Sequence, residues 1–213
     1  DGPSTAGWSA SARTALVAGL LEAVGAFRDP RAAGVLLAAL EVASARDVDV
    51  VRSAVEALGK LGDDAIAARL TAAATAPGLK RDAVLWGLGY CRRFVCAEVL
   101  ASAMATEADP EQARRLARAL GDVGNSWVWP TVTDASRGEE AAVRSVAAAV
   151  LVDAFARWDH VIVRTAAANA VLVVDAPSTP ALLEAALPRA VGADARAQVL
   201  ALQARFENNP VRR

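Results

Sequence analysis

The sequence has few of the residues that most often build catalytic or metal centres. Its 213 residues include one histidine, His160, and two cysteines, Cys91 and Cys96. An ordinary zinc site needs about four ligands of these types, so we predict no metal site. Phosphate-binding loops and dinucleotide-binding glycine fingerprints are absent, and "GWSAS" lacks the final glycine of a nucleophile elbow. These absences favour a protein that is not an enzyme and that needs no cofactor.

Aromatic side chains are also scarce. They make up 5% of the residues, whereas hydrophobic residues make up 54%, and much of that share is alanine. Alanine is the strongest helix former, and its small side chain allows close contacts between helices. Sustained alternating segments typical of β-strands are missing. The composition therefore predicts an all-helical protein with closely packed helices.

An excess of charge of one sign is missing as well. The chain has 23 basic and 24 acidic side chains and a formal net charge of −1. A surface built wholly for nucleic acid is normally basic, so nucleic acid is an unfavoured partner, although a local basic patch is still allowed. Charged residues interrupt each apolar run well before about 20 residues, the length that spans a bilayer, so we predict no membrane span.

Compartment and termini stay open at this level. We see no signal peptide, which makes a cytoplasmic location the default, but the chain starts at Asp1, as a processed exported protein or a fragment would. The segments 1–8 and 207–213 are expected to be flexible or capping ends. Cys91 and Cys96 would point to different faces of one helix, so we expect two small buried side chains, with a local disulfide or reactive thiol as the alternative.

What the sequence does contain is a repeated helical unit. In "VRSAVEALGKLGDD" two glycines follow an apolar helical pattern that begins at Arg52, and "ARRLARALGDVGNS" repeats the pattern from Arg114. The two arginines are 62 residues apart, and a related unit begins between them at Arg81. Weaker copies begin at Arg13, Arg144, Arg164 and Arg196. This period predicts a stacked array, in which each unit buries its apolar face against its neighbour.

Each unit is predicted to hold two helices with marked ends. Asp29-Pro30, Asp109-Pro110 and Thr179-Pro180 each place a capping side chain directly before proline at a first helical position. Ser126 is expected to cap the next helix, with Pro130 in its first turn. Of the paired glycines, one is expected to turn the chain in left-handed geometry, and the other to let neighbouring backbones come close.

The segment "DVDVVRSAVEALGKLGDDAIAARL" resembles a HEAT repeat of the short bacterial kind, related to phycobilin-lyase-type repeats. Asp159–Leu172 and Pro110–Gly124 are similar to it, and the likeness covers roughly Ser9 to Phe206. The resemblance implies an all-α α-solenoid: a right-handed superhelix of antiparallel helix pairs, with a concave face formed by the second helices. We therefore expect one HEAT-like domain over 1–213, with about six to seven units.

Two features refine this picture. The step from Arg144 to Arg164 is only 20 residues, so we expect an irregular junction near 139–160, formed by a missing helix or by one long helix. In arrays of this family the repeated arginine and a loop aspartate commonly form a ladder between neighbouring units. The resemblance assigns that structural role to the repeated arginines, with Asp47 or Asp49, Asp109 and Asp159 as their partners.

Candidate partner-binding residues come from the stripe that helical spacing places opposite the apolar face. A solvated face is the alternative. Arg115 and Arg118 project together from this stripe and could hold a carboxylate-rich peptide or a phosphate backbone, unless nearby acids make a neutral mosaic. Trp127 and Trp129 cannot share one face, so we expect one of them to meet solvent or a partner. The full predicted set is Arg115, Arg118, Arg92, Arg93, Trp127, Trp129, Ser53, Glu56 and Lys60.

Three functions are compatible with these features. The first is a non-catalytic scaffold or adaptor that binds a segment of a protein or peptide partner on the concave face. The second is a nucleic-acid-binding protein related in architecture to the HEAT-like alkylpurine DNA glycosylases, whose basic groove with Trp and Asp is similar to Trp158-Asp159 and the arginine cluster. The third is a ligand handler like the phycobilin lyases. The oligomeric state stays open.

Overall fold

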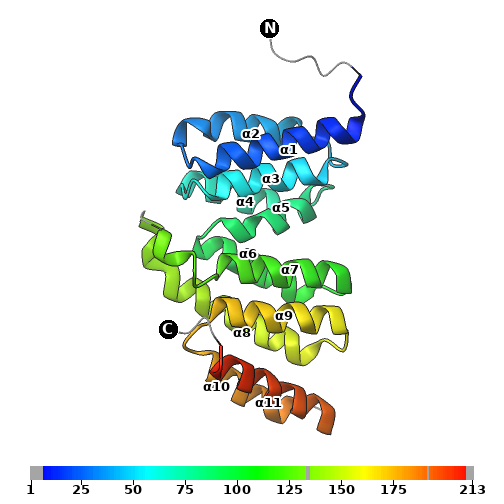
Figure 1. Cartoon of the computed structure of the whole chain (residues 1–213), viewed down its shortest axis with the longest axis vertical. Coiled ribbons are helices and arrows are strands. Elements are labelled where there is room, and N and C mark those ends of the chain that lie inside the picture. Colours follow the sequence, from blue (N-terminus) through cyan, green and yellow to red (C-terminus); the bar gives the residue numbers. More distant parts are fainter. Residues whose placement is uncertain (1–6, 133–134, 191, 210–213) are drawn as a thin grey trace. The chain divides into compact units, whose positions relative to one another are not determined.

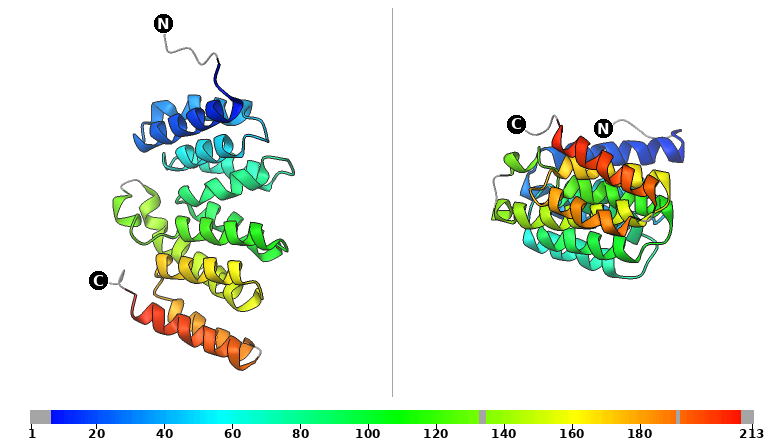
Figure 2. Two further views of the ribbon diagram at one scale, coloured as in Figure 1. Left: turned by 45° about the vertical axis from the view of Figure 1, so that its right-hand side comes forward. Right: turned by 90° about the horizontal axis from the view of Figure 1, so that it is seen from below.

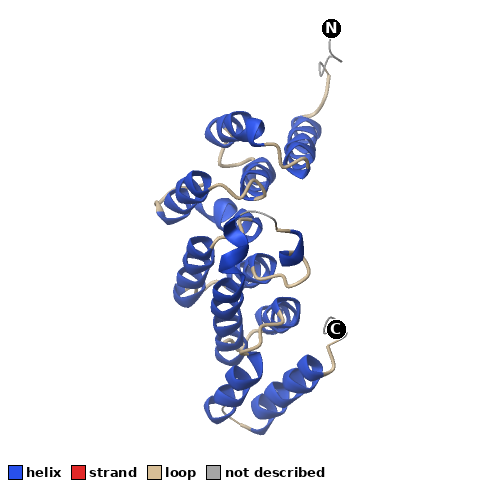
Figure 3. Cartoon of the chain, turned by 90° about the vertical axis from the view of Figure 1, so that its left-hand side faces the viewer, coloured by secondary structure: helices blue, strands red, loops and turns tan. Residues whose placement is uncertain are grey.

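The described part of the computed structural model, residues 7–132, 135–190 and 192–209, consists of helices and the loops between them, without any β-strand (Figure 3). The predicted all-α class is confirmed. Figure 1 labels the α-helices. They are α1 (Ala10–Ala26), α2 (Ala33–Val42), α3 (Val48–Gly59), α4 (Asp64–Thr75), α5 (Arg81–Gly87), α6 (Phe94–Thr106), α7 (Pro110–Val123), α8 (Glu140–Arg157), α9 (Val161–Val174), α10 (Thr179–Ala186) and α11 (Ala193–Glu207). Short 3₁₀ helices are η1 (Pro30–Ala32), η2 (Leu88–Tyr90), η3 (Trp129–Thr131), η4 (Ala135–Glu139) and η5 (Leu187–Arg189).

The chain divides into two compact units, Asp1–Cys91 and Arg92–Arg213. In the first unit α3 is the central helix, because α1, α2, α4 and α5 all pack against it. As a result α3 is covered on nearly every side, and from Val50 to Gly59 only Arg52 is not buried. A helix in this position has no free face to offer a partner.

The second unit is a stack of helix pairs. Its first helices α6, α8 and α10 pack in one row, and its second helices α7, α9 and α11 pack in another (Figure 2). Contacts within the pairs α6–α7, α8–α9 and α10–α11 join the two rows. Stacked antiparallel pairs of this kind are the HEAT-like α-solenoid arrangement that the sequence predicts.

The structure corrects the reading of Arg144. This arginine lies in α8, a first helix of a pair, whereas Arg114 and Arg164 lie in the second helices α7 and α9. Near 139–160 the chain forms one unbroken helix of 18 residues, α8, which is the first helix of the pair α8–α9 and does not stand for two turns of the array. Arg144 donates hydrogen bonds to the carbonyl oxygens of Val174 and Asp175 and so satisfies backbone groups at the end of α9.

The predicted helix caps are only partly right. Asp29 and Asp109 do cap, since Asp29 accepts a hydrogen bond from the Arg31 N–H at 2.9 Å and Asp109 accepts one from the Gln112 N–H at 2.8 Å. Thr179 is instead the first residue of α10, and no side chain caps that helix. Ser126 is no cap either: its hydroxyl donates to the Val173 carbonyl at 2.9 Å and ties the loop after α7 to the end of α9.

Of the two glycine pairs, only Gly59 and Gly62 show both predicted roles, one glycine in a close backbone contact and the other in a left-handed turn. Gly62 has φ +71°, a left-handed turn that other residues rarely adopt. Gly59 is a contact residue, because a Cβ there would lie 2.8 Å from the backbone N of Cys91. In the second pair, Gly121 is again a contact residue, but Gly124 has φ −90° and makes no left-handed turn.

The described residues do not form the predicted arginine–aspartate ladder between neighbouring repeats, although Arg52 does reach an acid of the preceding repeat, Glu22 of α1, at 3.8 Å. Arg52 and Arg164 do approach Asp49 and Asp159, at 3.9 Å and 3.6 Å, but each aspartate belongs to the same helix or to the loop directly before it. Asp109 does not pair with Arg114. Arg114 binds Glu111 one turn earlier on α7, with its Nε 2.9 Å from Oε2.

We predict opposite effects for two glycine substitutions in α1. A Cβ at Gly25 would lie 2.6 Å from the Cα of Ala57 in α3, whereas a Cβ at Gly19 would meet nothing within 4 Å. Gly25→Ala should therefore lower the free energy of unfolding by about 1–3 kcal/mol, because α1 and α3 must separate. Gly19→Ala, the matched control, should raise it by about 0.5–1 kcal/mol through helix propensity. Urea unfolding followed by circular dichroism measures both, and equal effects would contradict the close approach of α1 and α3.

Candidate functional site

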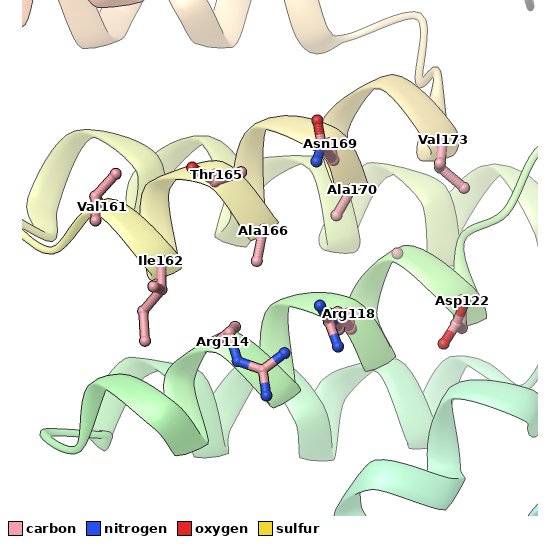
Figure 4. Close-up of a pocket in the computed structure, with 11 residues that line it drawn as sticks. Arg114, Arg118, Asp122, Val161, Ile162, Thr165, Ala166, Asn169, Ala170 and Val173 are labelled. Atoms are coloured by element: carbon pink, nitrogen blue, oxygen red, sulfur yellow. The ribbon is translucent and has the colours of Figure 1, made fainter.

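A hollow lies in the second unit, between the second helices α7 and α9. It is a cavity of about 450 Å³ that opens to solvent. Its lining is Arg114, Arg118, Gly121, Asp122, Val161, Ile162, Thr165, Ala166, Asn169, Ala170 and Val173. Figure 4 shows Ala166 and Ala170 pointing from α9 toward α7, with Arg114 and Arg118 on the opposite wall.

Small side chains create this hollow. At one end α7 and α9 nearly touch, because a Cβ added to Gly121 would lie 2.9 Å from the Cβ of Ala170. One turn earlier on α9 the residue facing α7 is Ala166, which is too short to fill the space beside Arg114 and Arg118 (Figure 4). Small residues thus hold the two helices close together, and space remains between them wherever no long apolar side chain fills it.

The two arginines of the cavity differ in how their charges are balanced. Arg114 and Arg115 both donate hydrogen bonds to Glu111, and these contacts, that of Arg114 first, lower the pKa of Glu111 to about 2. Arg118 is exposed and has no hydrogen-bond or ion-pair partner among the described residues. Asp122 lies one turn further along the same wall. The site therefore presents an apolar recess beside an arginine that has no direct hydrogen-bond or ion-pair partner among the described residues, which suits an apolar group attached to a carboxylate.

A second, smaller cavity lies on the other side of α9. It has a volume of about 290 Å³ and is lined from α9, α11 and the end of α8 by Phe155, Val161, Arg164, Thr165, Ala168, Gln198, Ala201, Leu202 and Arg205. Val161 and Thr165 line both cavities, so these two residues form the ridge between them.

Of the four predicted arginines, only Arg118 lines the cavity, and Arg92, Arg93 and Arg115 lie outside its lining. Arg118 lines the wall of the cavity. Its neighbour Arg115 does not line the cavity, and its Nε lies 3.2 Å from Glu111. Arg93 forms an ion pair with Glu139, with its Nη2 2.6 Å from Oε1. The same carboxylate accepts a hydrogen bond from the Phe94 N–H at the start of α6. Arg92 is partly buried and lines neither cavity.

Three predicted partner contacts are wrong because their side chains are buried. Ser53 and Glu56 are 0% and 5% exposed, since α3 is covered by its neighbours. Trp129 is also fully buried, and its indole N–H donates to the Val123 carbonyl at 3.2 Å. Trp127, at 59% exposed, is the tryptophan that meets solvent. Lys60 stacks over the Tyr90 ring, with its Nζ 5.1 Å from the ring centre.

The predicted set of partner-binding residues contains none from the α9 side of the cavity. Ala166, Ala170 and Asn169 were not singled out, because alanine is so common in this chain that its contact positions look like any other helical alanine. The available signal was Gly121, a glycine inside a helical pattern, which indicates that another helix lies against it.

The described residues offer no group of three His, Cys, Asp or Glu side chains that could hold a metal ion. Cys91 and Cys96 are both buried and are not joined by a disulfide, as expected for two small core side chains. Within the same described ranges no helix is both long enough and apolar enough to cross a lipid bilayer.

Comparison with known proteins gives structural neighbours only. No family model matches the chain, and no curated protein matches it. The matching solved structures include human deoxyhypusine hydroxylase in complex with glycerol (17% identity, 92% of this chain and 80% of that chain, TM-score 0.44). They also include the complex of CpcE and CpcF of phycocyanin lyase from Nostoc sp. PCC7120 (20% identity, 97% and 96%, TM-score 0.36). Both are HEAT-like helical proteins, and at these TM-scores neither likeness bears on function.

The burial of Glu56 leads to a pH-dependent prediction. Burial raises the pKa of this carboxyl group above its ordinary value of 4.5, although Arg52 and Lys60 act in the opposite direction. A raised folded-state pKa means that the folded chain holds the proton more tightly than the unfolded chain does, so stability falls as the pH rises from about 4.5 through the raised pKa. Glu56→Gln should lack this loss. Urea unfolding should show the variant to be more stable than the wild type at pH 7, with a difference that shrinks toward pH 4.5; a constant difference would contradict the raised pKa.

Proposed function

We propose that this chain is a non-catalytic binding protein, a scaffold or adaptor that holds a segment of a partner protein against the second helices α7 and α9. The observation that carries this proposal is the apolar cavity of about 450 Å³ with the unpaired Arg118 on its wall. Hollows that take a partner's side chain combine apolar walls with a few placed polar groups, and this cavity has that composition.

Each part of the cavity has a physical role in such binding. An apolar side chain that enters it leaves water and contacts Ile162, Ala166 and Val173, which stabilises the complex by about 25 cal/mol per Å² of apolar surface buried. A carboxylate beside that side chain can pair with Arg118, and a charge-assisted hydrogen bond contributes about 1.5–3 kcal/mol. Thr165 and Asn169, exposed on α9, can bond to the partner's backbone.

Nucleic acid is disfavoured as the partner by how the charges are arranged. A phosphate backbone needs several free cations in a row, but Glu111 binds both Arg114 and Arg115 and leaves only Arg118 free on this face of α7. Trp158 and Asp159 do not line the cavity either; Arg157 lies over the Trp158 ring, 5.8 Å from its centre, and Asp159 pairs with Arg164.

A small amphipathic ligand with carboxylate groups, such as a bilin, is the second candidate. The same two features favour it: apolar walls that suit a large conjugated ligand, and Arg118 as the partner of a carboxylate. Titration with a bilin, followed by absorbance, separates this candidate from the first. A spectral shift that Arg118→Glu abolishes would replace the peptide proposal with the ligand proposal.

The experiment that tests the peptide proposal is affinity capture of proteins from the cells that make this chain, with identification by mass spectrometry. We predict that Arg118→Glu and Ala166→Phe each reduce recovery of the bound partner at least about tenfold, because the first reverses the charge and the second fills the cavity. Arg46→Glu is the matched control, since it makes the same charge change at an exposed residue outside the site. Circular dichroism should show unchanged helical content in all three variants.

Equal recovery by all variants would place partner binding elsewhere on the chain. Binding of duplex DNA at low salt, lost on Arg118→Glu, would move the site to the nucleic-acid class. The salt series matters because affinity for a phosphate backbone falls steeply with ionic strength.

A further inference from the structure

The two cavities of the second unit are adjacent to each other. They lie in successive gaps of the row α7, α9, α11, and Val161 and Thr165 of α9 line both of them. Val161 is 66% exposed and Thr165 is exposed, so the ridge that separates the cavities is open to solvent. A partner segment that crosses this ridge reaches both recesses at once.

Each cavity also has one arginine whose charge is not neutralised. In the first cavity this is Arg118, which lacks a partner among the described residues. In the second it is Arg205, whose Nη2 donates to Asn169 Oδ1 at 3.2 Å, so its partner is a neutral amide. The remaining arginines, Arg114 and Arg164, are already paired with Glu111 and Asp159. The surface therefore repeats one motif, an apolar recess with a free positive charge, on both sides of α9.

The distance between the recesses selects the conformation of the occupant. Packed helices lie about 8–10 Å apart, so recesses in successive gaps are separated by roughly that distance. Side chains on one face of a β-strand recur at about 6.6 Å or 13 Å, which misses this spacing. On an α-helix, residues seven apart lie on one face and about 10.5 Å apart along the axis, which matches it.

We infer that the occupant is an amphipathic helix of a partner protein that lies across α7, α9 and α11. It inserts two apolar side chains, seven residues apart, into the two cavities. Beside each of them it carries an acidic residue, one for Arg118 and one for Arg205. This inference rests on the proposed function and deepens it, because it names the chemistry and conformation of the partner segment.

The test uses a synthetic helical peptide of about 20 residues, constrained by a lactam bridge on its outer face so that helix formation costs little on binding. It carries Leu at positions i and i+7 and Glu at i−3 and i+4, so each acid lies next to one anchor on the same face. Fluorescence anisotropy with the full chain measures its Kd. A peptide with the anchors five residues apart, and one with Lys in place of Glu, are the matched controls.

We expect the seven-residue peptide to bind at least about tenfold more tightly than either control peptide. Arg118→Glu and Arg205→Glu should each weaken it about tenfold, because each places a negative charge opposite an acid. Ala201→Trp, an exposed position that lines the second cavity, should do the same by filling it, whereas Ala204→Trp, exposed on the same helix but outside the lining, should not.

The outcomes separate this inference from the proposed function. If Arg118→Glu weakens binding but Arg205→Glu and Ala201→Trp do not, or if anchor spacing has no effect, the helix across two cavities is overturned while a partner at the first cavity stands. If no variant changes either peptide binding or partner capture, both proposals fall. A concentration-dependent dimer in sedimentation that Arg118→Glu disrupts would identify a second copy of the chain as the occupant and would also overturn the inference.

Discussion

Close contact between helices through small side chains is the constraint on which the structure depends. At Gly25 against Ala57 in the first unit, and at Gly121 against Ala170 in the second, there is no room for one added methyl group. Such contacts bury little area per residue, so each helix pair gains stability from several neighbours at once. They also fix where space is left over. Between α7 and α9 the same short side chains that permit contact at one end leave a recess at the other.

The fold class could be predicted from the sequence because the residue patterns that indicate it recur along the chain. Glycine after an apolar helical pattern, aspartate before proline and alanine at helical spacing all indicate helix pairs, and the structure confirms them at Asp29, Asp109 and Gly62. The same recurrence caused the main error. Arg144 begins an apolar pattern much like that of Arg164, yet it lies in a first helix, because both helices of a pair bury apolar residues at the same spacing.

The site was predictable only on one of its walls. Arg118 stands out in the sequence because it shares a face with Arg115, and the structure puts it at the cavity. Ser53 and Glu56 occupy equivalent positions in α3, but α3 is covered by helices on both sides and buries them. Helical periodicity tells which residues share a face; it does not tell how many neighbours a helix has. That number depends on tertiary packing, which no local pattern records.

The arrangement of charges explains how a chain with a formal net charge of −1 can present arginines without acidic partners on the proposed binding surface. α7 carries three arginines and α9 carries one, and three of these four have an acidic partner: Glu111 binds Arg114 and Arg115, and Asp159 pairs with Arg164. The hydrogen bond from Arg114 lowers the pKa of Glu111 to about 2, so this carboxylate is ionised at neutral pH and both contacts are charge-assisted. Among the described residues, one arginine beside each apolar recess, Arg118 or Arg205, has no acidic partner. On the proposed binding surface, the acids that bind the other arginines would therefore raise specificity, since a partner would have to place its acids opposite two defined arginines.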